Sequence, residues 1–330
     1  MALMEVPERN IAFDLVRITE GAALASARWL GRGDGKSGDG AAVDAMRLLF
    51  NTLDIQGEVV IGEGEKDEAP MLYNGEKIGT GKGPKLDVAV DPVEGTKLLS
   101  YGRPNAISVI GAAPSGAMLH PGHSFYMEKL VVGAAARDVI DLDAPVAVNL
   151  GHIAAALNKD VNDLVVFVLD KPRHKELIEQ IRLAGARIQL HTDGDVAGSL
   201  MAADPRADVD VMMGIGGTPE GVISACALKG MGGAMLARLA PQSEAEKASI
   251  EADGIDISRI LTIDDLVHGD DVYFAATGIT GGSLLSGVCY DKTGATTHSM
   301  LIRSKTGTIR YMESHHNWNK LMQISAIKYD

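Results

Sequence analysis

Strand and helix patterns alternate in the second half of this chain, and this alternation limits the possible fold more than any other feature. Each of three short apolar runs is followed by a segment whose apolar residues recur at helical spacing. The strands are expected at 163–170, 186–190 and 209–215, and the helices at 174–185, 195–203 and 219–228. Such βαβ repetition is typical of a parallel sheet covered by helices. We therefore expect an α/β domain that begins near residue 150.

The first half mixes helices and strands less regularly. Apolar residues recur at helical spacing over 9–30, and a glycine-rich polar loop follows at 31–40. Asp39 stands where the N-cap of a helix over 41–51 would be. Short strands are expected at 58–61, 86–90 and 107–112. This part is therefore expected to be a mixed α and β domain.

The length of the chain limits the number of domains, and its charge limits the kinds of partner that it can bind. Its 330 residues accommodate two domains, which we expect at 1–150 and 151–330, with a C-terminal tail that can pack back on the first. The 44 acidic residues exceed the 31 Lys and Arg residues, a formal charge of -13, without a block of like charge. Neither a nucleic acid nor a membrane surface is expected as a partner.

Cysteine usage and the N-terminus predict the compartment. Cys226 and Cys289 are the only cysteines, too few for a disulfide framework, and they favour a reducing cytosol. The first twenty residues mix charges and proline into their apolar positions, which excludes a secretory signal. No apolar run approaches the roughly 18 residues of a membrane span. A cytoplasmic protein is expected.

Two glycine-rich stretches are weak signals for phosphate binding. GRGDGKSGDG has only three residues between Gly31 and the Gly35-Lys36-Ser37 run, where a P-loop has four, and it follows a helix rather than a strand. GIGGTPEG, at 214–221, lacks the third glycine of a dinucleotide fingerprint. A glycine turn that opens a helix can still present backbone N–H groups to a phosphate.

The run LDVAVDPVEGTKLL, at 86–99, takes an apolar strand directly into acidic residues. Asp91 stands at the carboxyl end of the strand, where α/β proteins usually bind ligands. Gly95 permits a tight turn, so Asp91, Glu94 and the Val93 carbonyl can present three oxygens to one point. Hard divalent cations such as Mg²⁺ and Mn²⁺ take such ligands, and pairs of them serve in-line phosphoryl displacement. Taken alone, DPVEGT is better interpreted as an ordinary polar turn.

A second strand exit carries a similar density of acid. The run VVIGEGEKDEAPML ends its strand in Glu63, between two glycines, with Glu65, Asp67 and Glu68 behind it. A surface turn does not need so many carboxylates. Glu63 is the candidate ligand because it sits directly at the strand exit. If the substrate is a phosphate, metal ions must lie between it and these acids, which would otherwise repel it.

Cations follow the first strand of the second half. Lys171 and Arg173 flank Pro172 at the strand exit. A guanidinium beside an ammonium is what a non-reacting phosphate needs, because the two cations together provide charge and planar hydrogen-bond donors. The alternative for Arg173 is a structural ion pair.

Acids follow the two later strands. Asp193 and Asp195 bracket Gly194 at a strand-to-helix junction, where they can accept hydrogen bonds from sugar hydroxyls or simply cap the helix. Glu220 opens the helix after GIGGTP, near an N-terminus that favours phosphate although the residue is itself an acid. A metal ion between Glu220 and a phosphate would reconcile the two.

Taken together, eight motifs resemble a known family. In chain order they are GRGD, GDGAAVDAM, VIGEGEKDEAPMLY, DPVEGT, FYMEKL, KPRH, DGDVAGS and GIGGTPEGV. This set closely resembles class II fructose-1,6-bisphosphatases, of the lithium-sensitive, metal-dependent phosphatase superfamily, over nearly the whole chain. The superfamily has aspartate at the position of Glu94, and class II enzymes admit either acid. The resemblance implies a two-domain layered α/β/α/β/α sandwich of the sugar phosphatase type, with its site between the domains.

The resemblance also implies residue roles. The metal ligands would be Asp39, Glu63, Asp91, Glu94, Glu220 and, by superfamily analogy, the Val93 carbonyl. Thr96 would orient and deprotonate the attacking water, with Asp39 as its acid partner; the alternative is that Thr96 only caps a helix starting near Lys97. The substrate contacts would be Glu94, Gly95, Thr96, Tyr126, Lys171, Pro172, Arg173, Asp193, Gly194, Asp195 and Gly217.

The reaction implied is hydrolysis of the 1-phosphate of D-fructose 1,6-bisphosphate, which yields fructose 6-phosphate and inorganic phosphate. The family's properties imply two or more Mn²⁺ or Mg²⁺ ions, a role in gluconeogenesis and glycerol metabolism, and a homo-oligomer, either dimer or tetramer. Two alternatives stay open: a dual enzyme that also accepts sedoheptulose 1,7-bisphosphate, and a non-catalytic sugar-phosphate sensor on the same fold. The presence of Thr96 with all five acids favours an enzyme.

Overall fold

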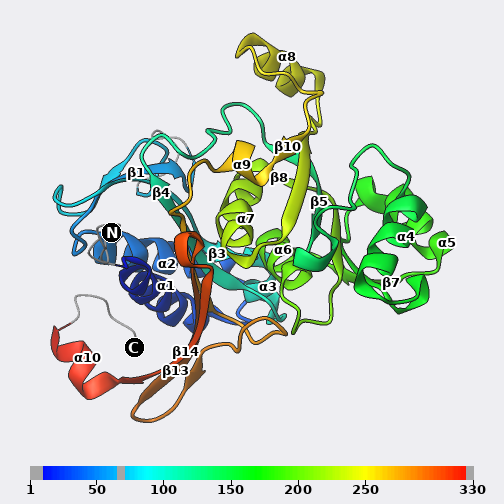
Figure 1. Cartoon of the computed structure of the whole chain (residues 1–330). Coiled ribbons are helices and arrows are strands. Elements are labelled where there is room, and N and C mark those ends of the chain that lie inside the picture. Colours follow the sequence, from blue (N-terminus) through cyan, green and yellow to red (C-terminus); the bar gives the residue numbers. More distant parts are fainter. Residues whose placement is uncertain (1–9, 65–70, 325–330) are drawn as a thin grey trace, which may run out of the picture.

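Two β-sheets and three layers of helices make up the protein (Figure 1). The computed structural model describes residues 10–64 and 71–324. The first sheet has the strand order β12-β13-β11-β4-β3-β1-β2, with β14 paired to β13. Its strands are β1 (Gln56–Ile61), β2 (Lys77–Ile78), β3 (Lys85–Glu94), β4 (Ile107–Pro114), β11 (Tyr273–Gly278), β12 (Cys289–Tyr290), β13 (Gly294–Arg303) and β14 (Thr308–Asn317).

The second sheet has the strand order β10-β9-β5-β8-β6-β7. Its strands are β5 (Tyr126–Val132), β6 (Val165–Leu169), β7 (Arg187–His191), β8 (Val211–Gly217), β9 (Ala234–Leu239) and β10 (Leu261–Thr262). The three predicted strands of the βαβ pattern, β6, β7 and β8, are parallel as expected. The sheet as a whole is mixed because β5 pairs antiparallel with both β8 and β9.

The helices form layers outside and between the sheets. Figure 1 shows α1 (Ala12–Ser26) and α2 (Gly35–Phe50) on one side, and α4 (Val146–Leu157) and α5 (Lys175–Ala184) on the other. Between the sheets lie α6 (Asp195–Ala203) and α7 (Thr218–Met231), and all nine residues of α6 are buried. Shorter helices are α3 (Thr96–Tyr101), α8 (Glu244–Ala252), α9 (Ile263–Leu266) and α10 (Trp318–Ile324).

Three apolar cores hold the five layers together. Alternate residues of β3 divide between two of them: Val88 and Val90 pack toward α1 and α2, and Ala89 packs toward the central helices. The third core lies between the second sheet and α4 with α5. The sequence of α6, DVAGSLMAA, is small and apolar on all sides, which is typical of a helix buried on every face. The α/β/α/β/α layering implied by the family resemblance is thus confirmed.

The division of the chain between the sheets differs from the expected boundary at residue 150. Every described strand between residues 126 and 262 belongs to the second sheet, so a cut at 150 would separate β5 from its partners. The strands within residues 273–317 belong to the first sheet. The C-terminal part that packs on the first domain is therefore a set of four strands and not a tail. Strand β5, YMEKLVV, carries charges within an apolar run, so its strand pattern in the sequence is weak, and the second sheet begins before residue 150.

The start of α2 is a second correction. This helix begins at Gly35 and includes Asp39, which is therefore not an N-cap. Asp34 is the cap, since its carboxylate accepts a hydrogen bond from the Ser37 N–H at 3.0 Å. Glycine is a poor helix former, but a Cβ at Gly38 would overlap the Leu99 side chain. Close packing therefore overrides the low helix propensity here.

The first helix is shorter than expected at its C-terminal end. It ends as an α-helix at Ser26, and a 3₁₀ turn continues to Trp29; the predicted first residue, Arg9, lies outside the described residues. In the described part of the chain, no helix combines the length and the apolarity that crossing a bilayer requires.

A carboxylate centre between the two sheets

Ends of elements from three layers meet at one cavity of about 350 Å³ between the sheets. Strands β1 and β3 deliver their exits from the first sheet, α2 contributes its second turn, and α7 contributes its first turn. Acids predominate among the charged residues of its wall. The lining residues are Asp39, Ile61, Gly62, Glu63, Val90, Asp91, Val93, Glu94, Gly95, Thr96, Asp193, Pro219, Glu220 and Ile223.

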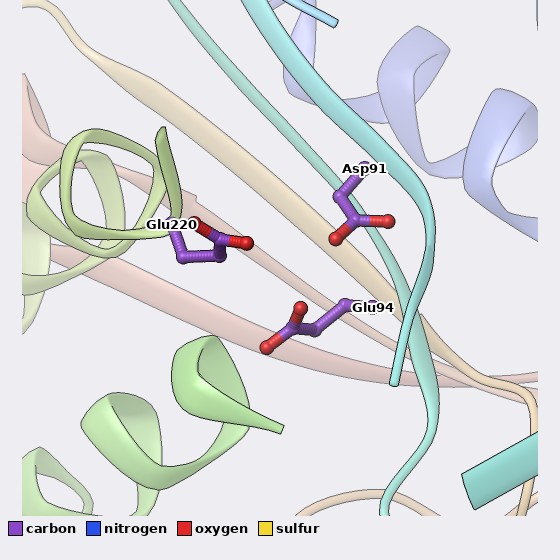
Figure 2. A group of neighbouring side chains, drawn as sticks. All are labelled: Asp91, Glu94 and Glu220. Atoms are coloured by element: carbon purple, nitrogen blue, oxygen red, sulfur yellow. The ribbon is translucent and has the colours of Figure 1, made fainter. Parts of the chain in front are cut away.

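Three carboxyl groups lie at the centre of this cavity. Asp91, Glu94 and Glu220 each offer an oxygen within 4.8 Å of the other two. Figure 2 shows Asp91 and Glu94 on β3 and Glu220 on α7, with their carboxyl groups turned toward one another. The pairing of β3 with β4 shifts register between Asp91 and Glu94, which lets both side chains serve the same side. Gly95 then turns the chain with φ 90°, in the left-handed region that favours glycine.

A second pair of acids stands beside the first group. Asp39 and Glu63 interact through their carboxyl groups, one from α2 and the other from the exit of β1. Burial, and then the charge of Asp39, raise the pKa of Glu63 to about 8. Burial is also the main cause that raises the pKa of Asp39. The pair therefore holds protons that a cation would displace.

The pKa values of the three central carboxyl groups, Asp91, Glu94 and Glu220, are raised in the same way. Burial, followed by the charge of Glu220, raises the pKa of Glu94 to about 8. Burial and the neighbouring Glu94 raise the pKa of Asp91 well above its usual range, and burial raises that of Glu220. Crowded, buried carboxyl groups are unfavourable without a counter-charge. The Glu220 Oε2 atom is moreover buried without a hydrogen-bond partner.

This donor set fits hard divalent cations. It consists of oxygen atoms only, it is rich in carboxylates, and it leaves a buried carboxylate oxygen available. The five acids expected to be metal ligands thus line one cavity. In the chain, Asp39 and Glu220 are separated by four of the eight strands of the first sheet and four of the six strands of the second.

Thr96 lies at the mouth of this group. Its hydroxyl donates to the Val93 carbonyl at 3.2 Å, and the Val93 N–H donates to Asp91 at 3.0 Å. Helix α3 begins at Thr96 itself, and Gly95 is its N-cap. The alternative that Thr96 caps a helix starting near Lys97 is therefore wrong. The Val93 carbonyl faces the Thr96 hydroxyl, at the rim of the carboxylate group.

A second cluster lies at the carboxyl end of the second sheet. The Arg173 guanidinium donates to the Ile215 carbonyl at 2.8 and 3.1 Å and lies 5.0 Å from the centre of the Tyr126 ring. Tyr126 is opposite Gly217 in the sheet. Gly217 in turn precedes Glu220 by three residues. The cluster is thus next to the cavity. Arg173 already has a backbone partner, so part of its role is structural.

The remaining candidates occupy the chain turns around this cluster. Lys171 precedes the 3₁₀ helix Pro172–His174, and Gly194 is the N-cap of α6 with φ 97°. Asp193 lines the cavity. Neither Lys171 nor Pro172 is among the lining residues of this cavity.

Asp195 is not among the lining residues of the cavity, and it contacts a residue that the sequence interpretation missed. Its carboxylate accepts a hydrogen bond from Lys129, and Lys129 also donates to the Gly217 carbonyl at 2.8 Å. The Lys129 side chain is 0% exposed. The available signal was a lysine inside the apolar strand YMEKLVV, which is a rare position for an unpaired charge.

Fold and site together define a layered α/β protein with a carboxylate centre whose donor set fits metal ions. The chain belongs to the family of bacterial fructose-1,6-bisphosphatases encoded by glpX, whose family model matches residues 9–316. It is 46% identical over 321 residues to fructose-1,6-bisphosphatase 1 class 2 of Escherichia coli strain K12. That alignment covers 93% of this chain and 95% of the relative. Fructose-1,6-bisphosphatase class 2 of Shigella flexneri matches with the same identity and coverage. The predicted family is confirmed.

Proposed function

We propose that this protein hydrolyses the 1-phosphate of D-fructose 1,6-bisphosphate to fructose 6-phosphate and inorganic phosphate. The observation that carries the proposal is the convergence of Asp91, Glu94 and Glu220 from two layers of the fold, in a chain 46% identical to class 2 fructose-1,6-bisphosphatases. The reaction would serve gluconeogenesis and the use of glycerol. We assign it to the cytosol, with the protein as a homo-oligomer.

Divalent cations, Mn²⁺ or Mg²⁺, are the cofactors in this proposal. Asp39, Glu63, Asp91, Glu94 and Glu220 would hold two or more of them, with the Val93 carbonyl as a further oxygen. Bound there, such ions polarise a phosphoryl oxygen and lower the pKa of a bound water. The acids also exclude a bare phosphate from the cavity, so substrate binding depends on the cations.

The protein's own groups supply orientation and proton transfer. Thr96 and Asp39 both line the cavity. The Thr96 hydroxyl would hold the attacking water, and Asp39 would accept the proton of that water. The hydroxyl is bound to the Val93 carbonyl at 3.2 Å and lies at the wall of the cavity, where a water can reach it. A water fixed in line with the phosphorus reacts faster because orientation entropy is already lost.

The other phosphate and the sugar would occupy the carboxyl end of the second sheet. Lys171, Arg173 and Tyr126 would contact the non-reacting phosphate, and Gly217, just before α7, would be a further contact. Asp193, at the cavity wall, would accept a sugar hydroxyl; Gly95, Pro172 and Gly194 would shape the turns that surround the sugar. Asp195 contributes mainly through Lys129. Binding this remote group aligns the reacting phosphate.

Phosphate release from a panel of sugar bisphosphates, with Mg²⁺ or Mn²⁺ and in chelator, tests the proposal. We expect turnover of fructose 1,6-bisphosphate that disappears in chelator and returns with added metal. Equal or faster turnover of sedoheptulose 1,7-bisphosphate would replace the proposal with a dual enzyme. Binding without turnover of either sugar would indicate a sensor. Full activity in chelator would overturn the metal assignment.

A further inference from the structure

Lys129 is a fully buried cation at the inner end of the carboxylate centre. It lies on β5, one of the two middle strands of the second sheet, and its ammonium group donates to Asp195 and, at 2.8 Å, to the Gly217 carbonyl. These two partners begin the two central helices: Asp195 is the first residue of α6, and Gly217 is the N-cap of α7. One side chain thus joins β5 to the starts of both helices.

Three glycines pack closely against Lys129 and the acids near it. A Cβ at Gly216 would overlap the Asp195 carboxylate, and a Cβ at Gly217 would overlap the Glu220 carboxylate. A Cβ at Gly221 would overlap the Met127 sulfur and meet the Lys129 stem at 3.6 Å. Glycines therefore allow the acids and α7 to approach the strand that carries Lys129.

Both helix starts lead directly to metal-ligand candidates. The N–H of Val196, next to Asp195, donates to a Glu94 carboxylate oxygen at 2.7 Å. Glu220 lies in the first turn of α7 with its carboxylate against Gly217. Glu94 comes from the first sheet, and Glu220 comes from the central layer. Their separation therefore depends on where α6 and α7 begin, which Lys129 fixes.

A buried ammonium is expensive compared with an apolar side chain of similar size. A methionine would fill much of the same volume without this cost. Lys129 does not even satisfy all of its neighbours, because Asp195 Oδ1 and Glu220 Oε2 remain buried without partners. Stability alone therefore does not explain a lysine here.

We propose that Lys129 is a positioning residue for the metal centre: it clamps the starts of α6 and α7 so that Glu94 and Glu220 stand at metal-binding separation. This inference rests on the proposed metal function and concerns the geometry of the ligands. Residues that orient metal ligands typically affect metal affinity by about 10- to 100-fold. Loss of the clamp therefore weakens the metal site.

Mn²⁺ binding to the full chain tests the inference without relying on turnover. The variant is Lys129→Met, and free Mn²⁺ is followed by electron paramagnetic resonance during titration. We expect Mn²⁺ to bind about 10-fold or more weakly than to the wild type. Because Lys129→Met leaves the Asp195 carboxylate alone in the core, the variant can fail to fold. The double variant Lys129→Met/Asp195→Asn removes that lone charge and is measured in parallel, with folding checked by calorimetry.

Lys229 provides the matched control. It lies near the other end of α7, its side chain is 11% exposed, and it likewise donates to an aspartate, Asp264, and to a carbonyl, that of Val267, at 2.9 Å. Lys229→Met therefore removes a similar bridge from the same helix far from the acids. We expect Mn²⁺ affinity to remain at the wild-type level in this variant.

The outcomes separate the two proposals. Absence of Mn²⁺ binding in the wild type would overturn the metal function itself. Wild-type binding together with unchanged affinity in a folded Lys129 variant would overturn only the positioning role. Tighter binding in that variant would also overturn it, because Lys129 would then act merely as a charge that opposes the metal. Equal weakening by Lys229→Met would mean that any lost bridge on α7 has this effect.

Discussion

Glu94 shows how one residue serves two purposes at the centre. It is buried, 5% exposed, and one oxygen accepts the Val196 N–H, so its direction is set by α6. A Glu94 carboxylate oxygen also lies within 4.8 Å of oxygens of Asp91 and Glu220. Such an arrangement is unfavourable until a cation binds, because the three carboxyl groups repel one another once ionised.

We expect Asp91→Asn and Glu94→Gln each to abolish turnover while leaving the fold intact. Each substitution removes a ligand charge but keeps the size of the side chain, and an amide oxygen can still accept the hydrogen bonds. In chelator, the melting temperature should equal or exceed that of the wild type because repulsion is relieved. Phosphate-release assays and calorimetry measure the two quantities. Wild-type turnover in either variant would contradict the role as metal ligand.

Thr96 provides a second prediction at the scale of the residue. If its hydroxyl orients the attacking water, Thr96→Ala should lower kcat by roughly 10² or more while metal and substrate still bind. Thr96→Ser keeps the oxygen and should retain measurable activity. Steady-state kinetics with both variants, alongside their melting temperatures, make the comparison. A Thr96→Ala protein with near-normal kcat and a lowered melting temperature would contradict the catalytic role. Thr96 would then have only a structural role, through its hydrogen bond to Val93.

At the scale of the element, the first turn of α7 depends on glycine. Gly217 has φ −68° and ψ 144°, which alanine adopts without strain, so the constraint there is the Glu220 carboxylate and not the backbone. We expect Gly217→Ala to displace that carboxylate and weaken Mn²⁺ binding by about 10-fold or more. Titration of Mn²⁺ into the variant measures the effect. Unchanged affinity would mean that Glu220 can bind from another rotamer.

Gly151 is the control for a glycine in a helix. It lies within α4, and a Cβ there would meet nothing within 4 Å. Gly151→Ala should therefore raise the free energy of unfolding by about 0.5–1 kcal/mol, because alanine loses less backbone entropy in a helix. Turnover should not change. Denaturant unfolding measures the gain, and a loss of stability would mean that α4 is packed more closely than the structure indicates.

At the scale of the whole molecule, the acids make stability depend on pH. In the metal-free protein the pKa values of Glu63 and Glu94 are raised to about 8 from an ordinary value of 4.5. Between these values the folded state binds more protons than the unfolded state does, so stability falls as pH rises. Below the ordinary carboxyl pKa, these groups are protonated in both the folded and the unfolded state. The loss of stability that comes from ionising them in the folded state is then absent.

The stabilisation by added metal should increase with pH, whereas the stability of the metal-free protein should decrease. Cations bind the ionised carboxylates, so the rise in melting temperature caused by Mn²⁺ should grow from pH 5.5 to pH 8, as expected for binding linked to proton release. Thermal melts in chelator and in Mn²⁺ at several pH values check this. Glu94→Gln should show a shallower pH slope in chelator. A metal effect that is the same at every pH would contradict the raised pKa values.

Features that depend on interactions between residues close together in the chain could be predicted from the sequence. Glu63 and Asp91 could be identified from the sequence because both stand where an apolar strand ends in glycine and proline, a local signal. The strands β6, β7 and β8 and the full extent of α6 were predictable for the same reason. Asp39 was assigned to the site by family resemblance, while its local placement as an N-cap was wrong.

Tertiary structure decided how these local pieces combine. The sequence by itself determined the α/β class and a set of acids at strand exits, because alternation and turn residues act over a few positions. The family and its layered architecture followed from the resemblance of eight motifs. It did not determine that β11 to β14 return to the first sheet, or that Lys129 lies under Asp195 and Gly217. Those features depend on contacts between residues far apart in the chain, which appear only once the layers have packed.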